Sequence, residues 1–116
     1  EIIIGVTNDK QFGPMLLVGL GGIYVEVFKD AALYPVPLNK GEAMNMLKSL
    51  KSYKMLTGYR GSAPCDLDAL TDMMVKIANY AYEHKDEIKE MDLNPVFVYP
   101  EGQGVCAVDA LIVKYR

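Results

Sequence analysis

The stretch DLNPVFVYPEGQGVCAVDALIV, residues 92–113, contains the pattern that decides the fold. Two apolar runs, 92–99 and 105–113, flank the connector 100–104, which is rich in turn-forming residues. This arrangement is typical of an antiparallel hairpin. We therefore predict two paired strands joined by a turn that centres on Glu101-Gly102.

Three polar residues of this hairpin suggest a metal site. Asp92 and Asn94 lie two residues apart, so their side chains leave the same face of the sheet. The predicted turn places Asn94 directly opposite Asp109, with Cβ atoms about 4.5–5.5 Å apart. A carboxylate and an amide oxygen suit Mg²⁺, which takes its other ligands from water and substrate phosphate. The alternative is a solvated polar pair on an ordinary hairpin, and the spacing alone slightly favours it.

The segments before the hairpin predict strands first and helices afterwards. Alternating or β-rich runs predict strands at 2–6, 15–18 and 23–28. A short fourth strand is possible at 33–36, but two prolines confine it to a sheet edge or an irregular crossing. Cys106 alternates within the last strand and is predicted to be a small core residue.

Two helices follow the strands. Asn39 and Glu42 form a capping-box pattern for a helix that should end near Lys51, and 54–63 is predicted to be a loop. Asp66 then opens a longer helix with one apolar stripe. The order of elements indicates an α+β fold, in which a mainly antiparallel sheet is covered on one face by two helices.

Composition narrows the class of protein. The 116 residues fit a single domain, 1–116, and a net charge of −3 with no basic stripe argues against a nucleic-acid partner. No apolar run reaches the length of a membrane span, and a cytoplasmic protein is expected. The chain opens on Glu1 and three isoleucines, as if truncated inside or just before a strand. Cys65 and Cys106 are isolated, which disfavours a zinc site.

Two glycine-rich segments are candidates for ligand binding. The glycines of segment 19–22 precede a strand rather than a helix, which excludes a dinucleotide-binding fingerprint and leaves a tight turn as the simplest interpretation. Arg60 lies between Gly58 and Gly61, where its guanidinium could contact a phosphate or a carboxylate, although a solvated loop arginine is the alternative. His84, the only histidine, lies among charged residues near a helix end and is interpreted as solvated.

Several of these motifs resemble one family. The run Asp92-Leu93-Asn94-Pro95, the later segment 107–110 and the Gly-Tyr-Arg-Gly segment 58–61 are similar to the NDP-forming acyl-CoA synthetases, which contain an ATP-grasp fold. The segments 12–14 (FGP) and 19–26 (GLGGIYVE) resemble the same family. Asp92 departs from the succinyl-CoA synthetase branch, which tends to have glutamate there.

The resemblance implies a fold, cofactors and site residues. It implies the C-terminal subdomain of an ATP-grasp domain, with Mg²⁺ and ATP or ADP as ligands. Asn94 and Asp109 would bind the metal. The remaining implied site residues are Gly21 and Gly22 for nucleotide binding, and Asp92, Glu26 and Arg60 for phosphoryl transfer.

The implied enzyme is an ADP-forming acyl-CoA synthetase, with acetyl-CoA as the favoured substrate type. Its reaction converts acyl-CoA, ADP and phosphate to acid, CoA and ATP through a phosphohistidine supplied elsewhere. The expected partners are an N-terminal ATP-grasp subdomain and a CoA-binding subunit or domain, so the chain alone should be inactive. The alternatives are another ATP-grasp carboxylate ligase and a non-catalytic α+β ligand-sensing or assembly domain.

Overall fold

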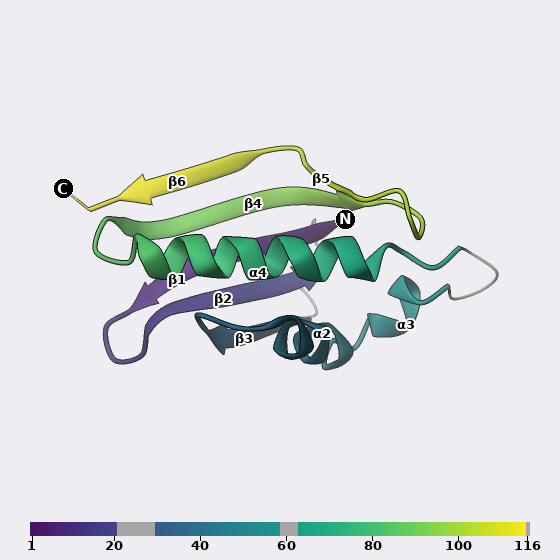
Figure 1. The fold of residues 1–116 in the computed structure, drawn as a ribbon, viewed down its shortest axis with the longest axis horizontal. Helices are drawn as coiled ribbons and strands as arrows, with labels where there is room; N and C mark the ends of the chain where they lie inside the picture. The colour runs from purple at the N-terminus through teal and green to yellow at the C-terminus, as the bar shows by residue number, and fades with distance from the viewer. Residues whose placement is uncertain (21–29, 59–62, 116) are drawn as a thin grey trace.

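The computed structural model describes residues 1–20, 30–58 and 63–115. Within these residues, six strands form one antiparallel sheet in the order β3-β2-β1-β4-β5, with β6 also pairing with β4 (Figure 1). The strands are β1 (Ile2–Asp9), β2 (Gly13–Leu20), β3 (Ala31–Pro35), β4 (Ile88–Val98), β5 (Val105–Ala107) and β6 (Ala110–Lys114). The helices are α2 (Lys40–Lys48), α3 (Tyr53–Leu56) and α4 (Leu67–Glu83).

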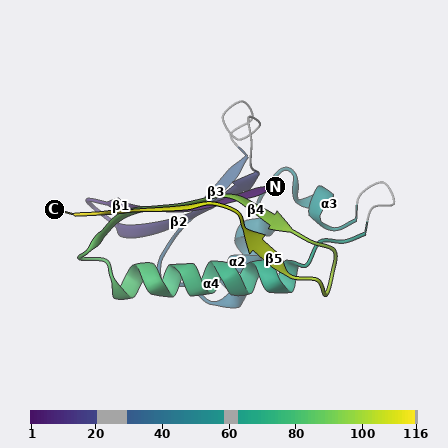
Figure 2. The same ribbon diagram turned by 90° about the horizontal axis from the view of Figure 1, so that it is seen from above.

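Helices α2 and α4 pack on one face of this sheet, which gives the domain two layers (Figure 2). Alternation along β1 turns Ile2, Ile4 and Val6 toward the helices, and each is at most 2% exposed. Helix α4 presents a stripe that includes the buried Leu70 and Met74. Burying each large apolar side chain contributes about 1.5–3 kcal/mol. The predicted α+β fold, with two helices covering one face of a mainly antiparallel sheet, is confirmed.

Side-chain caps start both helices where the sequence predicted. The Asn39 side chain accepts a hydrogen bond from the Glu42 amide at 2.8 Å, and the Glu42 carboxylate accepts one from the Asn39 amide at 2.9 Å. This reciprocal pair completes the capping box of α2. At α4, the Asp66 carboxylate accepts a hydrogen bond from the Ala69 amide at 3.1 Å. None of the helices in the described residues is long and apolar enough to cross a membrane.

The prediction was wrong in the segment between α2 and α4. Helix α2 ends before Lys51, and the short helix α3 occupies part of the predicted loop 54–63. The cause is tertiary, because the buried carboxylate of Asp30 accepts hydrogen bonds from the amides of Lys51 and Ser52 at 2.7 and 2.9 Å. The side chain of Leu56 is also buried. These long-range contacts fold the chain here and are invisible to a local pattern.

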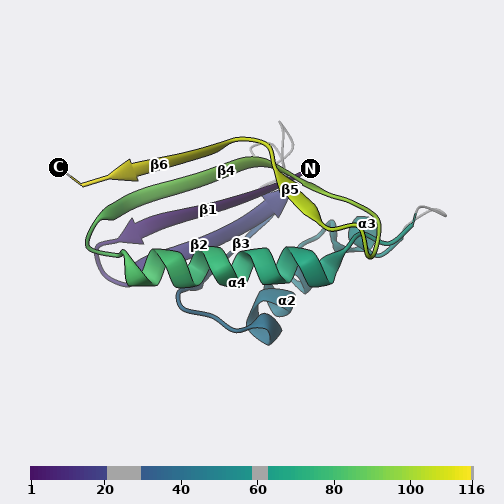
Figure 3. The same ribbon diagram turned by 45° about the horizontal axis from the view of Figure 1, so that its top comes forward.

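The C-terminal hairpin has the predicted register, but its return strand is interrupted. Phe97 pairs with Cys106 and Leu93 with Ala110, which is the pairing that the predicted turn requires. Val108 and Asp109 separate β5 from β6, so β4 pairs with two short strands in succession (Figure 3). Asn94 and Asp109, the two predicted metal ligands, therefore lie where the pairing of β4 with the return strand is interrupted.

Candidate metal and nucleotide site

A β-bulge interrupts β4 at Asn94 and Pro95. Ile4 of β1 pairs with Leu93, whereas Ile2 pairs with Val96, so β4 holds one residue more than β1 over this stretch. Proline has no backbone N–H to donate and is found within sheets at edges or bulges. A bulge bends its strand, re-aims the local side chains and is frequent beside active sites. The bulge thus makes this part of β4 a candidate for a functional site.

The bulge faces the break in the return strand. The Asn94 amide donates a hydrogen bond to the Asp109 carbonyl oxygen at 3.2 Å, and the Val108 amide donates one to the Pro95 carbonyl oxygen at 3.0 Å. Asn94 and Asp109 are both exposed. The structure therefore brings the two predicted metal ligands into direct backbone contact and leaves both accessible.

The side chains of this pair have oxygen atoms available for a ligand. One Asp109 carboxylate oxygen accepts a hydrogen bond from the Ala110 amide at 2.9 Å, which orients the group. Within the described residues, the other Asp109 oxygen and the Asn94 side chain have no hydrogen-bond partner. One anionic and one neutral oxygen ligand fit a Mg²⁺ ion that takes its other ligands from water and substrate phosphate. Two protein ligands are too few for a site built from protein atoms alone.

Asp92 lies on the face of β4 that points away from the helices. It is exposed, whereas its neighbours Met91 and Leu93 are each only 8% exposed. Its partners across the sheet are Gly5 on β1 and Leu111 on β6. Because Gly5 has no side chain, β1 places no side chain beside the Asp92 carboxylate.

Comparison with known proteins identifies the family. A family model described as "ATP-grasp domain" matches residues 1–113. The chain belongs to the ATP-grasp family. Among curated proteins, this ATP-grasp domain is 48% identical over 113 residues to the beta subunit of acetate–CoA ligase [ADP-forming] II from Pyrococcus furiosus, covering 97% of the chain and 48% of the relative. It is also 48% identical over 114 residues to acetate–CoA ligase [ADP-forming] from Methanocaldococcus jannaschii, and this match covers 98% of the chain and 16% of the relative.

A solved structure of one relative contains ligands. The dinucleotide-forming acetyl-coenzyme A synthetase 1 of Ca. Korarchaeum cryptofilum, in complex with coenzyme A and Mg-AMPPCP, superposes with a TM-score of 0.92. The two chains are 43% identical, and the match covers 99% of the ATP-grasp domain and 53% of that chain. The resemblance inferred from the sequence is confirmed. The domain spans about half the length of the Pyrococcus furiosus beta subunit and about a sixth of the Methanocaldococcus jannaschii relative.

Several predicted site residues lie outside the described residues of the ATP-grasp domain. These are Gly21, Gly22, Glu26 and Arg60, together with the predicted strand 23–28. Their roles remain predictions from the family resemblance.

His84 lies apart from the Asn94–Asp109 pair, at the C-terminal end of α4. Its ring packs against Tyr80 with centroids 4.4 Å apart, and Nδ1 lies 3.5 Å from a Glu87 carboxylate oxygen. Its side chain is 37% exposed. These contacts are those of a solvated helix end.

Sequence reasoning missed two features of the site. The first is the bulge, for which Pro95 in a strand flanked on both sides was an available signal. The second is Asp66, which was predicted only as the start of a helix but also binds the β4–β5 connector through the Gly102 and Gly104 amides. A local sequence pattern cannot predict that contact, because Gly102 and Gly104 lie 36 and 38 residues away from Asp66.

Proposed function

We propose that the ATP-grasp domain is the Mg²⁺- and nucleotide-binding part of an ADP-forming acyl-CoA synthetase of the acetyl-CoA type. The reaction is acyl-CoA + ADP + phosphate ⇌ acid + CoA + ATP. One observation carries the proposal: Asn94 and Asp109, both exposed, meet at the β4 bulge, and among the described residues the Asn94 side chain and one Asp109 carboxylate oxygen have no hydrogen-bond partner. The relatives that are named ADP-forming CoA ligases favour this synthetase over a ligase that joins a carboxylate to an amine.

In this proposal, Asn94 and Asp109 hold the metal, and Asp92 on the same face positions the phosphoryl group for its relay. Bound Mg²⁺ would neutralise charge on the phosphate oxygens during phosphoryl transfer. Arg60 and Glu26 act at the same site, and Gly21 and Gly22 bind the nucleotide; these four roles rest on the family resemblance alone.

The face opposite α2 and α4 supports the proposed partners. It carries the polar residues of the site beside apolar side chains, among which Leu33 and Leu111 are 58% and 60% exposed. An N-terminal ATP-grasp subdomain would close over this face and enclose the nucleotide. A CoA-binding subunit or domain would bring the phosphohistidine, because His84 lies at a solvated helix end and has no such role here.

The metal assignment is tested in the complete synthetase. Asp109→Asn keeps the shape of the side chain but removes an anionic ligand, so activity should fall sharply and the Mg²⁺ concentration for half-maximal activity should rise. Asn94→Ala should act in the same direction. Asp86→Asn, the same substitution at an exposed turn beyond α4, is the matched control. If Asp109→Asn and Asp86→Asn have the same Mg²⁺ dependence, the assignment is wrong.

A further inference from the structure

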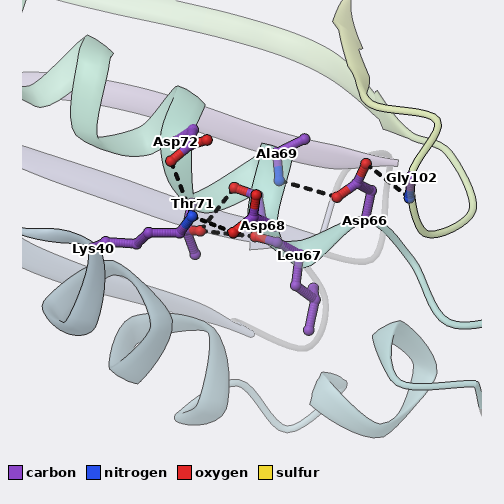
Figure 4. Close-up of polar contacts among 8 residues, drawn as sticks. All are labelled: Lys40, Asp66, Leu67, Asp68, Ala69, Thr71, Asp72 and Gly102. Atoms are coloured by element: carbon purple, nitrogen blue, oxygen red, sulfur yellow. Dashed lines mark hydrogen bonds and ion pairs between the residues drawn. The ribbon is translucent and has the colours of Figure 1, made fainter.

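The connector between β4 and β5 is tied to the start of α4 by one carboxylate. Asp66 is only 7% exposed, and its two oxygens have different partners (Figure 4). Oδ1 accepts the capping hydrogen bond from the Ala69 amide at 3.1 Å. Oδ2 accepts hydrogen bonds from the Gly102 and Gly104 amides at 3.1 and 2.8 Å. One side chain thus caps a helix and clamps a loop.

Backbone contacts fasten the same two segments. The Asp66 amide donates to the Tyr99 carbonyl oxygen at 2.8 Å, and the Glu101 amide donates to the Pro64 carbonyl oxygen at 2.9 Å. The residues before α4 therefore lie along the tip of the hairpin. Hydrogen bonds to an ionised carboxylate are roughly twice as strong as neutral ones, so the Asp66 side chain adds the strongest contacts of this junction.

The clamped tip belongs to an arm that bends away from the sheet. We define the arm as residues 95–108, which contain the end of β4, the connector and β5. From above, the arm turns out of the sheet layer toward the start of α4 (Figure 2). Its ladder is short and continuous, from Val96 paired with Ala107 to Val98 paired with Val105. Because this ladder holds the arm together as one unit, the contacts at the two ends of the arm set its orientation.

The two ends of the arm are the clamp and the proposed metal site. At the tip, Asp66 binds the connector. At the base, the Asn94 amide bonds to the Asp109 carbonyl, and these two residues flank the arm directly. A change in the angle of the arm must be taken up at its base, where the bulge and the break make the ladder least regular.

We propose that Asp66 is a positioning residue for the metal site: by clamping the arm to α4, its carboxylate fixes the separation and direction of the Asn94 and Asp109 side chains. This inference rests on the proposed function. Asp66 acts through the arm and does not itself contact the metal. A plain helix cap is the competing explanation, and the two roles are separable because they use different oxygens.

Asp66→Asn separates the two roles. Asparagine caps helices as well as aspartate, so its carbonyl oxygen can keep the bond to the Ala69 amide. Its NH₂ group would then face the Gly102 and Gly104 amides, donor against donor, and the clamp would be lost. Asn39→Ala is the control, since it removes the cap of α2 and Asn39 has no hydrogen bond to the hairpin among the described residues.

The first readout is metal binding by the complete synthetase, measured with Mn²⁺ and ADP by electron paramagnetic resonance. Asp66→Asn should raise the Mn²⁺ dissociation constant by about three- to tenfold. This is less than the loss of metal affinity, about 10–100-fold, that is typical when a residue hydrogen-bonded directly to a metal ligand is replaced. Asn39→Ala should leave it unchanged. An unchanged constant in Asp66→Asn would overturn the inference.

The second readout is amide hydrogen exchange by mass spectrometry on the same proteins. In Asp66→Asn, peptides that cover 92–98 and 104–110 should exchange faster, while peptides within 70–83 of α4 keep their protection. Faster exchange throughout α4 with no change at 92–98 would assign Asp66 to helix capping alone.

The Asp109→Asn variant distinguishes this inference from the proposed function. If Asp109→Asn weakens Mn²⁺ binding and Asp66→Asn does not, only the positioning role fails. If neither substitution changes Mn²⁺ binding, the metal assignment fails and the positioning role fails with it.

Discussion

Two strand glycines, Gly5 and Gly19, allow a paired test of the sheet face that carries the site. Neither has a positive φ, so an alanine is compatible with the backbone at both positions. A Cβ at Gly19 would lie 2.9 Å from the Asp30 carbonyl oxygen and 3.1 Å from the Ala31 Cβ. A Cβ at Gly5 would meet only the Met91 carbonyl oxygen, at 3.4 Å, which is an ordinary contact. Packing within the described residues therefore requires glycine at position 19 but not at position 5.

The two substitutions should change stability in different ways. Replacing glycine by alanine at a compatible position stabilises by about 0.4–1 kcal/mol, because the unfolded chain loses freedom. Gly5→Ala should show this gain. Gly19→Ala adds the cost of overpacking, about 1–3 kcal/mol, so the two variants should differ by that amount. Urea denaturation of the 116-residue chain measures the difference, provided that the m-values agree.

The same pair tests whether a ligand approaches the sheet. Gly5 pairs with Asp92, so the methyl group of Gly5→Ala would stand beside the proposed site. In the complete synthetase, this variant should be at least as stable as the wild type and yet have a severalfold higher KM for ADP. Equal destabilisation by Gly5→Ala and Gly19→Ala would refute the packing argument. An unchanged KM would show that the nucleotide does not reach Gly5.

Two further predictions concern Arg60 and Asp66. Arg60→Ala should lower synthetase activity at unchanged thermal stability; wild-type kinetics would instead indicate a solvated loop arginine. Hydrogen bonds from the amides of Ala69 and then Gly104 lower the pKa of Asp66. Its contribution to stability is thus complete above the unfolded-state pKa of about 3.9 and is lost as pH falls through the lower folded-state pKa. Below about pH 4, the free energy of unfolding of the wild type should therefore fall more steeply with decreasing pH than that of Asp66→Asn. Urea denaturation at a series of acidic pH values measures both, and parallel plots of unfolding free energy against pH would contradict the prediction.

The sequence predicted the elements whose causes are local. The cap of α2 and the apolar stripe of α4 each lie within a few residues of the structure they determine. The hairpin register followed from the turn at 101–102 and the flanking runs. The short helix α3 was missed because the Asp30 carboxylate that binds the two residues just before it lies 21 and 22 residues away from them in the chain.

The error at Cys106 has a specific geometric origin. Uninterrupted alternation along the hairpin turns Cys106 to the core, and that was the prediction. In the structure, Cys106 is exposed and pairs with Phe97, which is 36% exposed. The extra residue in the β4 bulge shifts the alternation by one, so Val96 is buried although a continuous pleat would expose it. An unrecognised bulge thus reverses every assignment of faces beyond it.

That reversal also explains how one hairpin can serve both sides of the sheet. Before the bulge, Asp92 points away from the helices, toward the proposed nucleotide side. Beyond it, the arm turns toward α4, and its connector reaches the Asp66 carboxylate. A flat hairpin would keep its tip in the plane of the sheet and away from the helix layer. The bulge therefore makes the clamp possible, and the clamp in turn holds the bend at which the proposed ligands meet. Because each feature depends on the other, removing the Asp66 carboxylate should loosen the base of the arm as well as its tip.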